Sequence, residues 1–178
     1  IFMAGKSNDK ELLNKTLLFI TNLLNTNNIP NWFIGYGTLL GIVRENSCID
    51  GDDDVDIIID INNYNIIKQI LIDNGFILEY GYGIGNSKYI IKTKHTDNYC
   101  SVDFYMSILD NIGNFNDIWE KVLWTKCYND NNMLIEYNWN NETLYLPNNY
   151  ETKLINRYGE NWKIPLNTKG PTPRKLAI

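Results

Sequence analysis

Apolar residues return every three or four positions in four parts of the chain, and this spacing predicts four helices. The expected helices cover residues 7–27, 37–46, 62–75 and 146–159. Ser7 or Asn8 can cap the first helix and Asn148 the fourth, because their side chains accept hydrogen bonds from free backbone N–H groups. Gly75 and Gly159 are expected to end the third and the fourth helix.

Runs of β-branched and aromatic residues predict the strands. The expected strands cover residues 32–36, 54–61, 76–81, 88–95, 99–108, 122–129 and 133–139. Several of them follow one another without an intervening helix, which argues against the regular doubly wound pattern of a Rossmann fold. We therefore expect one α/β (α+β) domain over residues 1–178, built on a mixed sheet, with an irregular tail over residues 160–178.

Composition limits the possible classes of protein. With 178 residues, 44% of them hydrophobic, the chain can fill one domain with a core but not two. A net charge of −5 and a pI of about 4.9 argue against general binding of nucleic acid or of an anionic membrane. Cys48, Cys100 and Cys127 are far apart, which is typical of reduced intracellular thiols. No apolar run is long enough to span a bilayer and no signal peptide is visible, which fits a cytoplasmic location but leaves the native compartment open.

The segment "CIDGDDDVDIII", residues 48–59, carries the strongest chemical signal. Five aspartates lie between Asp50 and Asp56, before and inside an expected strand that is rich in isoleucine. Because residues two apart point from the same face of a strand, Asp54 and Asp56 project together, and Asp52 joins them if the strand extends that far. Like charges this close destabilise a fold unless a cation neutralises them. Since carboxylates and substrate phosphates are ligands of Mg²⁺ and Mn²⁺, the segment predicts a divalent-cation site.

Two other segments complete this predicted site. In "GYGTLLG", Gly35, Gly37 and Thr38 form a turn from strand to helix, where free N–H groups and a hydroxyl can bind a phosphate. In "SVDFY", Asp103 lies among strand-forming residues, where a carboxylate can be a further metal ligand or a base. The expected metal ligands are Asp52, Asp54, Asp56 and Asp103.

Each of these signals also has a purely structural interpretation. A Gly-Thr turn is most often only a turn, an aspartate-rich loop is most often solvated surface, and Asp103 can be an edge-strand carboxylate. The aspartate segment does not match an EF-hand, because the sixth residue from Asp50 is Val55 instead of glycine and the twelfth is Ile61 instead of glutamate. The three signals together still favour a site for metal and phosphate.

The segment "GYGTLLGIVRENSCIDGDDDVDI" resembles the LicD/fukutin-related family of the nucleotidyltransferase superfamily. That family shows a Gly-Thr-Leu-Leu-Gly turn, an arginine at the position of Arg44, and an acidic segment. Gly51 departs from the pattern, because the family commonly has tryptophan there. The segment "LPNNYETKLINRYGENWKIP" is similar to the family's closing pattern, so the resemblance extends over most of the chain. The matching acidic residues are Asp52, Asp53, Asp54 and Asp56.

The resemblance implies a nucleotidyltransferase-like fold and a metal-dependent phosphotransferase. Such enzymes move a phospho-alcohol, such as phosphocholine or ribitol phosphate, from a CDP-activated donor to a glycan hydroxyl. Mg²⁺ or Mn²⁺ is then the expected cofactor, a CDP-alcohol or another nucleotide the donor, and a glycan the acceptor, with no nucleic acid as partner. The nearest alternative is a nucleotidyltransferase that moves NMP from an NTP to a sugar, a small molecule or a protein. A third is a glycan- or nucleotide-binding module without catalysis, although no key carboxylate is missing.

The resemblance also implies roles for single residues. The expected catalytic residues are Asp54, Asp56 and Asp103, and the expected phosphate-binding residues are Gly37, Thr38 and Arg44. The first two aspartates would bridge two metal ions, while Asp103 would hold one of them and act as the base. Arg44 can alternatively form a salt bridge with Asp52 or Asp53.

Three lysines lie on one face of an expected strand, because they are an even number of residues apart. Lys88, Lys92 and Lys94 can form a solvated face or point at a nucleotide phosphate. The pattern of this strand does not decide between the two.

Overall fold

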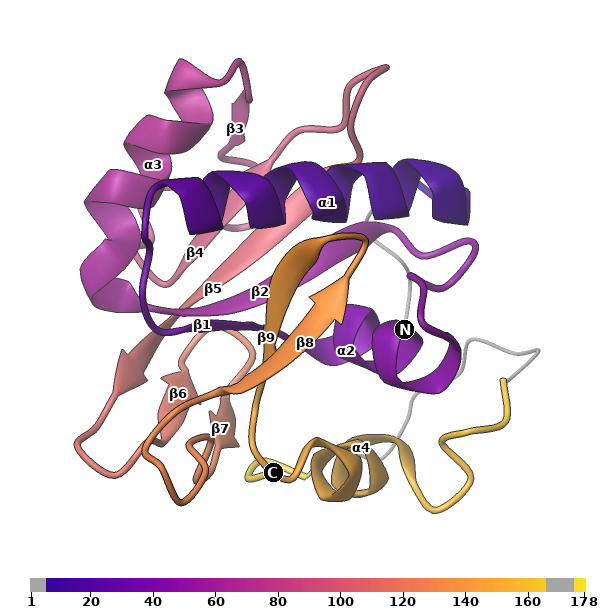
Figure 1. Ribbon diagram of the computed structural model, residues 1–178. Helices are drawn as coiled ribbons and strands as arrows, with labels where there is room; N and C mark the ends of the chain where they lie inside the picture. The colour runs from indigo at the N-terminus through magenta and orange to yellow at the C-terminus, as the bar shows by residue number, and fades with distance from the viewer. Residues whose placement is uncertain (1–5, 166–174) are drawn as a thin grey trace.

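A mixed β-sheet with helices against it forms the centre of the molecule, of which the computed structural model describes residues 6–165 and 175–178 (Figure 1). Its elements are, in chain order, α1 (Lys10–Thr26), β1 (Trp32–Ile34), α2 (Tyr36–Glu45), β2 (Asp54–Asp60), the 3₁₀ helix η1 (Ile61–Asn63), α3 (Tyr64–Asp73), β3 (Leu78–Glu79), β4 (Ile90–Thr93), β5 (Ser101–Leu109), β6 (Phe115–Asp117), β7 (Val122–Trp124), β8 (Ile135–Trp139), β9 (Glu142–Leu146) and α4 (Tyr150–Tyr158). The expected α/β (α+β) class, with a mixed sheet flanked by helices, is confirmed.

The order of the strands brings the two main candidate segments together. The sheet runs β1–β2–β5–β4–β3, and β5 continues into a hairpin with β6 and β7. β2 and β5 are parallel, whereas the other paired strands of this sheet are antiparallel. The register places Asp56 of β2 beside Asp103 of β5. The β8–β9 hairpin is a separate two-stranded sheet.

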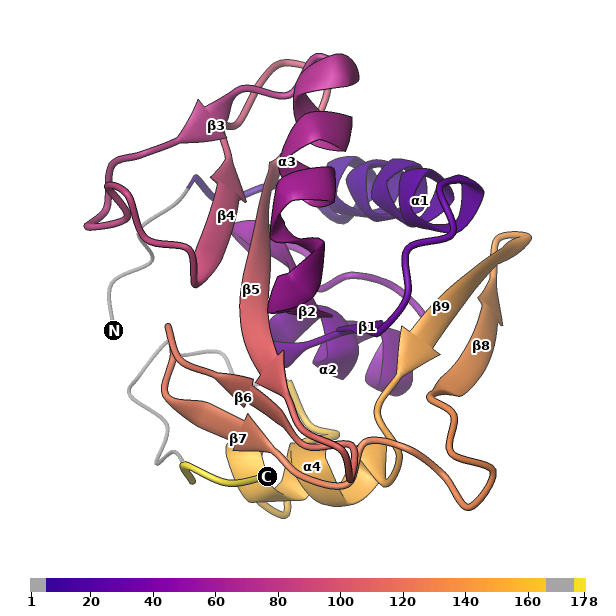
Figure 2. The ribbon, with the colours of Figure 1, turned by 90° about the vertical axis from the view of Figure 1, so that its left-hand side faces the viewer.

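Helices α1 and α3 cover one face of the sheet, as Figures 1 and 2 show together. Phe104 of β5 lies on this face with Ile20 of α1 and Ile67 of α3. Because successive residues of a strand alternate between faces, its neighbours Asp103 and Tyr105 point to the opposite face. The core therefore lies under the two helices, and the other face of the sheet remains for polar groups.

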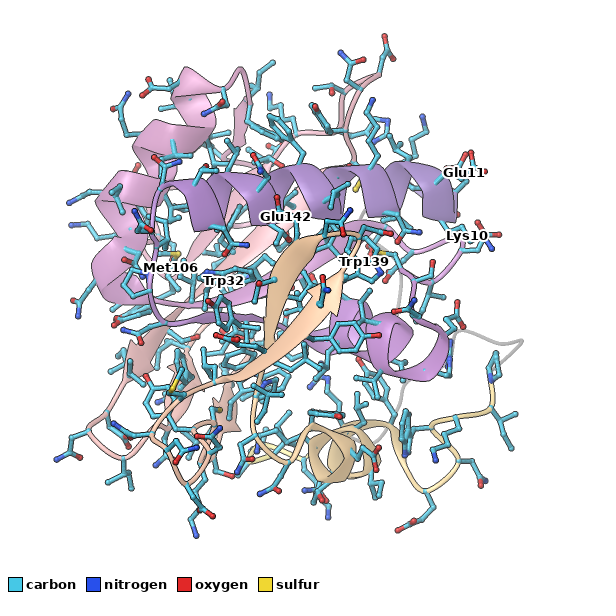
Figure 3. The ribbon with its side chains drawn as sticks, in the orientation of Figure 1. Lys10, Glu11, Trp32, Met106, Trp139 and Glu142 are labelled. Carbon is cyan, nitrogen blue, oxygen red and sulfur yellow. The ribbon has the colours of Figure 1, made fainter. Side chains whose placement is uncertain are left out.

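The β8–β9 hairpin packs against β1 and α1 (Figure 3). Trp32 of β1 is fully buried and meets Tyr145 of β9 edge to face, with 5.1 Å between the ring centroids. Glu142 accepts hydrogen bonds from the side-chain amides of Asn22 and Asn25 of α1, at 2.7 Å and 3.1 Å. These contacts attach the hairpin to the edge of the sheet that β1 forms.

The helix caps differ from the sequence prediction. Asp9 caps α1, because its carboxylate accepts a hydrogen bond from a backbone N–H of the first turn at 2.8 Å, so the prediction of Ser7 or Asn8 is wrong. At the start of α4, Asn149 holds the cap position in a left-handed conformation, so the prediction of Asn148 is also wrong. In both cases the capping residue lies one or two positions further along the chain than expected.

The strand boundaries also differ for local reasons. β1 ends at Ile34 instead of residue 36, because Tyr36 has a φ of 45°, which extended strands do not adopt, and α2 begins there. The sequence prediction missed β6 and β9. For β9 a signal exists, since Asn140 and Asn141 both have positive φ and form the two-residue turn typical of a hairpin.

Part of the expected irregular tail is ordered against the sheet. Residues 160–165 form turns, as expected, but Ala177 forms a parallel bridge with Leu123 of β7. The N–H of Ile178 donates to the carbonyl of Leu123 at 2.8 Å, and the Ile178 side chain is buried. Residues 160–165 and 175–178 contain no helix or strand, so this single bridge does not contradict an irregular tail, and residues 166–174 lie outside the described part of the chain.

Two further expectations concern the cysteines and the membrane. Cys48, Cys100 and Cys127 are all buried and free, which agrees with reduced thiols. Within residues 6–165 and 175–178, no helix combines the length and the apolar character that crossing a bilayer requires.

Candidate active site

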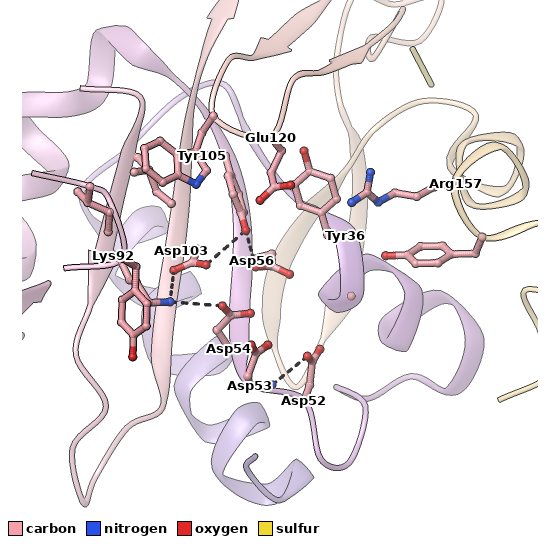
Figure 4. Close-up of a pocket in the computed structure, with 16 residues that line it drawn as sticks. Tyr36, Asp52, Asp53, Asp54, Asp56, Lys92, Asp103, Tyr105, Glu120 and Arg157 are labelled. Atoms are coloured by element: carbon pink, nitrogen blue, oxygen red, sulfur yellow. Dashed lines mark hydrogen bonds and ion pairs between the residues drawn. The ribbon is translucent and has the colours of Figure 1, made fainter. Parts of the chain in front are cut away.

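A cavity of about 440 Å³ opens on the face of the sheet opposite α1 and α3 (Figure 4). Its walls come from β2, β4 and β5, the loop before β2, the start of α2, the link between β6 and β7, and α4. The cavity has the size of a small-molecule site. Two cations line it, Lys92 and Arg157, together with six carboxylates. The carboxylates are Asp52, Asp53, Asp54, Asp56, Asp103 and Glu120.

Asp54, Asp56 and Asp103 meet at the centre of the cavity floor. The first two alternate with Val55 on β2, and the parallel register with β5 puts Asp103 beside Asp56. One carboxylate oxygen from each of the three lies within 4.8 Å of the other two. The Tyr105 hydroxyl, two residues after Asp103 on the same face of β5, lies 3.4 Å from Asp56 Oδ1 and 3.3 Å from Asp103 Oδ2 and donates to them.

Burial and mutual repulsion disfavour the charged forms of these carboxyls. Burial raises the pKa of Asp54 well above its ordinary value, and the charges of Asp56 and Asp103 raise it further. The pKa of Asp56 is raised in the same way, by burial and then by the charge of Asp103. Burial also raises the pKa of Tyr105, so its hydroxyl stays protonated and remains a donor. Such a cluster favours a divalent cation, because the cation restores the ionised form of its ligands.

The donor set fits Mg²⁺ or Mn²⁺, which take carboxylate oxygens as ligands. A second group of oxygens within 4.8 Å of one another comes from Asp52, Asp53 and Asp54. Asp54 belongs to both groups, so the two groups of oxygens adjoin in the cavity. The structure thus brings the four expected metal ligands to one cavity, and Asp53 lies with them.

Lys92 of β4 is the counter-charge at the cavity floor. The antiparallel register of β4 and β5 places it beside Asp103. Its Nζ lies 2.8 Å from Asp103 Oδ1 and 3.6 Å from Asp54 Oδ2. Burial lowers the pKa of Lys92, but the charges of Asp103 and Asp54 outweigh burial, and the net shift is upward, so the side chain is cationic. The lysine pattern allowed either a solvated face or a face that points at a phosphate. Lys92 points into the site, whereas Lys88 is exposed.

The loop before β2 is held by the segment that precedes α1. The backbone N–H of Asn8 donates to the carbonyl of Asp52 at 3.0 Å, and its side-chain amide donates to the carbonyl of Asp53, also at 3.0 Å. Gly51 has a φ of 89°, a conformation that favours glycine, at the position where the family commonly has tryptophan. The loop conformation therefore accounts for the glycine in this chain.

The three residues expected to bind phosphate occupy different places. Gly37 lines the cavity, and a Cβ added to it would lie 2.7 Å from Asp52 Oδ2, so only glycine lets that carboxylate approach. Thr38 is buried below the floor, where its Oγ1 accepts a hydrogen bond from the N–H of Asp56 at 2.9 Å. Arg44 donates to the carbonyl of Trp162 at 3.3 Å and pairs with Glu45 at 3.4 Å instead of Asp52 or Asp53, and it is not among the residues described as lining the cavity. The structure brings only Gly37 of the three to the cavity surface.

Sequence reasoning missed the wall that faces the aspartates. This wall consists of Tyr36 at the start of α2, Trp119 and Glu120 between β6 and β7, and Arg157 and Tyr158 of α4. Tyr36, Arg157 and Tyr158 lie in the two segments that resemble the family, but no spacing rule places them opposite the aspartates. Tyr105 is different, since the two-residue alternation from Asp103 gives a signal that places it on the same face.

Comparison with known proteins now adds to this geometry. The model of the LicD/FKTN/FKRP family, nucleotidyltransferase domain, matches residues 28–165. The lincosamide antibiotic adenylyltransferase LnuA, in a lincomycin-bound crystal structure, has a TM-score of 0.51 and 18% identity over 83% of this chain and 85% of its own. The antibiotic-resistance factor ANT(2'')-Ia has a TM-score of 0.54 and 11% identity over 78% of this chain and 66% of its own.

At such low identities the two solved structures show the fold alone, and that fold is nucleotidyltransferase-like, as expected. Comparison with curated protein sequences gives no match. The family model covers more than half of the chain, including the turn, the acidic segment and the closing pattern on which the resemblance was based. The resemblance is therefore confirmed, and the chain belongs to the LicD/FKTN/FKRP family through a nucleotidyltransferase domain at residues 28–165.

Proposed function

We propose that this protein is a metal-dependent phosphotransferase that moves a phospho-alcohol from a CDP-activated donor to a glycan hydroxyl. The phospho-alcohol is of the phosphocholine or ribitol phosphate kind. Family membership and fold support an enzyme of the nucleotidyl- or phosphotransferase type. The observation that carries the proposal is the convergence of Asp54, Asp56 and Asp103 on one cavity, with oxygens of all three within 4.8 Å of one another.

The proposed reaction is a displacement at phosphorus. The acceptor hydroxyl oxygen forms a bond to the phosphorus that carries the alcohol, the bond from this phosphorus to the CMP oxygen breaks, and CMP leaves with the bonding electrons. Asp103 accepts the proton of the hydroxyl. Asp54 and Asp56 would hold Mg²⁺ or Mn²⁺, and such a cation would neutralise phosphate charge and lower the pKa of the hydroxyl. Tyr105 keeps the carboxylates of Asp56 and Asp103 oriented by donating to both.

The start of α2 is the proposed binding site for the donor's diphosphate. Gly37 lies at the cavity surface in the first turn of this helix, where free N–H groups favour an anion. A contact of Thr38 or Arg44 with phosphate rests on the family resemblance, since neither is among the described residues that line the cavity. For Thr38 the observed hydrogen bond supports a positioning role, because it fixes the backbone of Asp56.

The alternative is a nucleotidyltransferase that moves NMP from an NTP to a sugar, a small molecule or a protein. The observation that favours it is the fold likeness to LnuA, which is described as an adenylyltransferase. The same carboxylates would serve, but the hydroxyl would attack the phosphorus next to the nucleoside, and pyrophosphate would leave. The two reactions therefore differ in their released product.

A donor screen followed by product analysis tests the proposal. CDP-choline, CDP-ribitol, CTP and ATP are each added with Mn²⁺, and the midpoint of thermal unfolding identifies the donors that bind. The binding donor is then incubated with a glycan mixture, and ³¹P NMR measures the released product. CMP release that is lost in Asp56→Asn supports the proposal. Pyrophosphate release supports the alternative, and failure of every CDP-alcohol to stabilise the protein or to be consumed refutes the proposal.

A further inference from the structure

Arg157 is the cation on the cavity wall that faces the aspartates (Figure 4). It lies on α4 and is only 8% exposed. Its Nη1 is buried and has no hydrogen-bond partner among the described residues. Arginine is rarely buried without a partner, because removing an unpaired charge from water is strongly unfavourable. The guanidinium lies over the Tyr36 ring and has a side-chain hydrogen bond with Tyr158, so the unpartnered Nη1 indicates that one further acceptor is missing.

A ring and a buried carboxyl hold Arg157 in place. Its Cζ lies over the Tyr36 ring, 4.3 Å from the centroid. The Tyr36 hydroxyl in turn donates to Asp117 Oδ2 at 2.5 Å, and Asp117 Oδ1 accepts from the N–H of Glu120 at 3.1 Å. A ring face beneath the guanidinium leaves the N–H groups at its edge for another partner. The donors of Arg157 are thus oriented before a ligand arrives.

The backbone of Tyr36 supports a binding role for this pair. Its φ of 45° is rare for an aromatic residue, and strained residues of this kind cluster at ligand sites. The Tyr36 ring also meets the ring of Tyr105 edge to face, with 5.0 Å between centroids. Since Tyr105 donates to Asp56 and Asp103, a continuous set of contacts joins the arginine wall to the carboxylate floor.

The carboxylates and Arg157 lie on facing sides of the cavity, so its lining offers a cation site and a cation. Lys92 is already paired with Asp103 and Asp54, so Arg157 is the cation in the described lining that remains for a ligand. Cations held by the aspartates would bind one phosphate, and a guanidinium can bind two oxygens of a second phosphate in a forked geometry. A carboxylate ligand would use only one of the two sides.

We propose that Arg157 binds the second phosphate of a nucleoside diphosphate ester or triphosphate, opposite the phosphate held at the carboxylates. The identity of this ligand rests on the proposed function. Tyr36 and Asp117 are positioning residues, which hold the guanidinium for that contact.

Isothermal titration calorimetry with inorganic pyrophosphate, CDP and cytidine, each in Mg²⁺, tests this assignment. Arg157→Gln is expected to weaken binding of pyrophosphate and of CDP by about 10- to 100-fold, as loss of hydrogen bonds to a charged group does. Cytidine affinity is expected to stay the same. Lys153→Gln is the matched control, because Lys153 lies one turn earlier on α4, is buried, and is not among the described lining residues. It is expected to change the pyrophosphate Kd less than twofold.

Arg157→Lys keeps the charge but loses the fork, and a loss of about 3- to 10-fold is expected. If Arg157→Gln does not fold, the affinity of Arg157→Lys for pyrophosphate and CDP tests whether Arg157 binds the second phosphate. The assignment would be overturned if the folded Arg157 variants bound pyrophosphate and CDP as tightly as the wild-type protein does, including the case in which only their thermal midpoint is lowered. A wild-type protein that binds neither pyrophosphate nor CDP would also overturn it. Arg157-dependent binding without CMP release from any CDP-alcohol would leave the assignment intact and reject the proposed function.

Discussion

Asp56→Asn should stabilise the cation-free protein while reducing its response to Mn²⁺. The substitution keeps the size of the side chain and removes one of three buried negative charges. Asp56 also lies 3.4 Å from the Tyr105 hydroxyl, and an asparagine oxygen can still accept that hydrogen bond. In the wild-type protein the lysine at the floor pairs with Asp103 and Asp54, so Asp56 receives the least direct compensation.

The magnitude follows from the spacing of the carboxylates. The oxygens of Asp54, Asp56 and Asp103 lie within 4.8 Å of one another. At an effective dielectric constant of about 20, each like-charged pair at this distance repels by about 3 kcal/mol. Partial protonation and the nearby Lys92 reduce the two repulsions on Asp56, and we expect a net gain in unfolding free energy of about 1–3 kcal/mol. For a chain of 178 residues this corresponds to about 2–12 °C in the thermal midpoint.

Thermal unfolding with EDTA and with increasing Mn²⁺ measures both effects. At a Mn²⁺ concentration of 100 times the Kd, the wild-type protein should gain about 2.7 kcal/mol, or about 5–11 °C. Asp56→Asn should gain less, because the group of Asp54, Asp56 and Asp103 loses one charged ligand, while the group of Asp52, Asp53 and Asp54 is unchanged. The stability advantage of the variant in EDTA should therefore narrow in Mn²⁺.

Asp60→Asn is the matched control, since Asp60 is at the other end of β2 and is buried to a similar degree. Its carboxylate accepts from the N–H of Asn62 at 3.0 Å at the start of η1 and belongs to neither carboxylate group of the cavity. This variant should keep the full Mn²⁺ response. If Asp56→Asn is less stable than the wild-type protein in EDTA, or keeps the full Mn²⁺ response, the assignment of Asp54, Asp56 and Asp103 to a cation site is refuted.

Three further predictions concern other parts of the cavity. Lys92→Met should lower the unfolding free energy in EDTA by about 1–3 kcal/mol and enlarge the Mn²⁺ response, because two buried carboxylates lose their counter-charge. Urea unfolding measures the change in free energy, with the exposed Lys88→Met as control. An unchanged unfolding free energy would contradict the prediction. Gly37→Ala should keep the fold but weaken Mn²⁺ binding by about 3- to 10-fold in calorimetry, because the new Cβ would lie 2.7 Å from Asp52 Oδ2 and displace that carboxylate. An unchanged Kd for Mn²⁺ would argue against Asp52 as a metal ligand. Burial raises the pKa of Asp117 from 3.8 to about 6, so the folded state binds its proton more tightly; stability relative to Asp117→Asn should be greatest near pH 4 and fall by roughly 3 kcal/mol as pH rises to 7, and a difference in urea unfolding that does not vary with pH would contradict this.

The carboxylate floor shows how far local sequence patterns reach. Strand periodicity places Asp54 and Asp56 on one face of β2, and the same rule places Asp103 and Tyr105 on one face of β5. Periodicity does not say which strands pair. The parallel register that sets Asp56 beside Asp103 depends on the packing of the whole sheet.

Lys92 illustrates an ambiguity that local patterns leave open. Alternation predicts that Lys88, Lys92 and Lys94 share a face, but a solvated face and a face toward a ligand have the same pattern. The antiparallel pairing of β4 with β5 decides, because it puts Lys92 directly beside Asp103. Thr38 and Arg44 show the converse, since a motif identified them and the fold places them behind the cavity surface.

The sequence alone determined the α/β class, the main helices and strands, the family, and the strand face on which each acidic residue of the floor lies, because these follow from local spacing and motifs. Tertiary structure alone decided the opposite wall, where Arg157 of α4 lies over Tyr36 of α2 and Asp117 of β6 holds that ring. Periodicity reports which side of one element is buried, whereas a cavity depends on how elements far apart in the chain pack against one another.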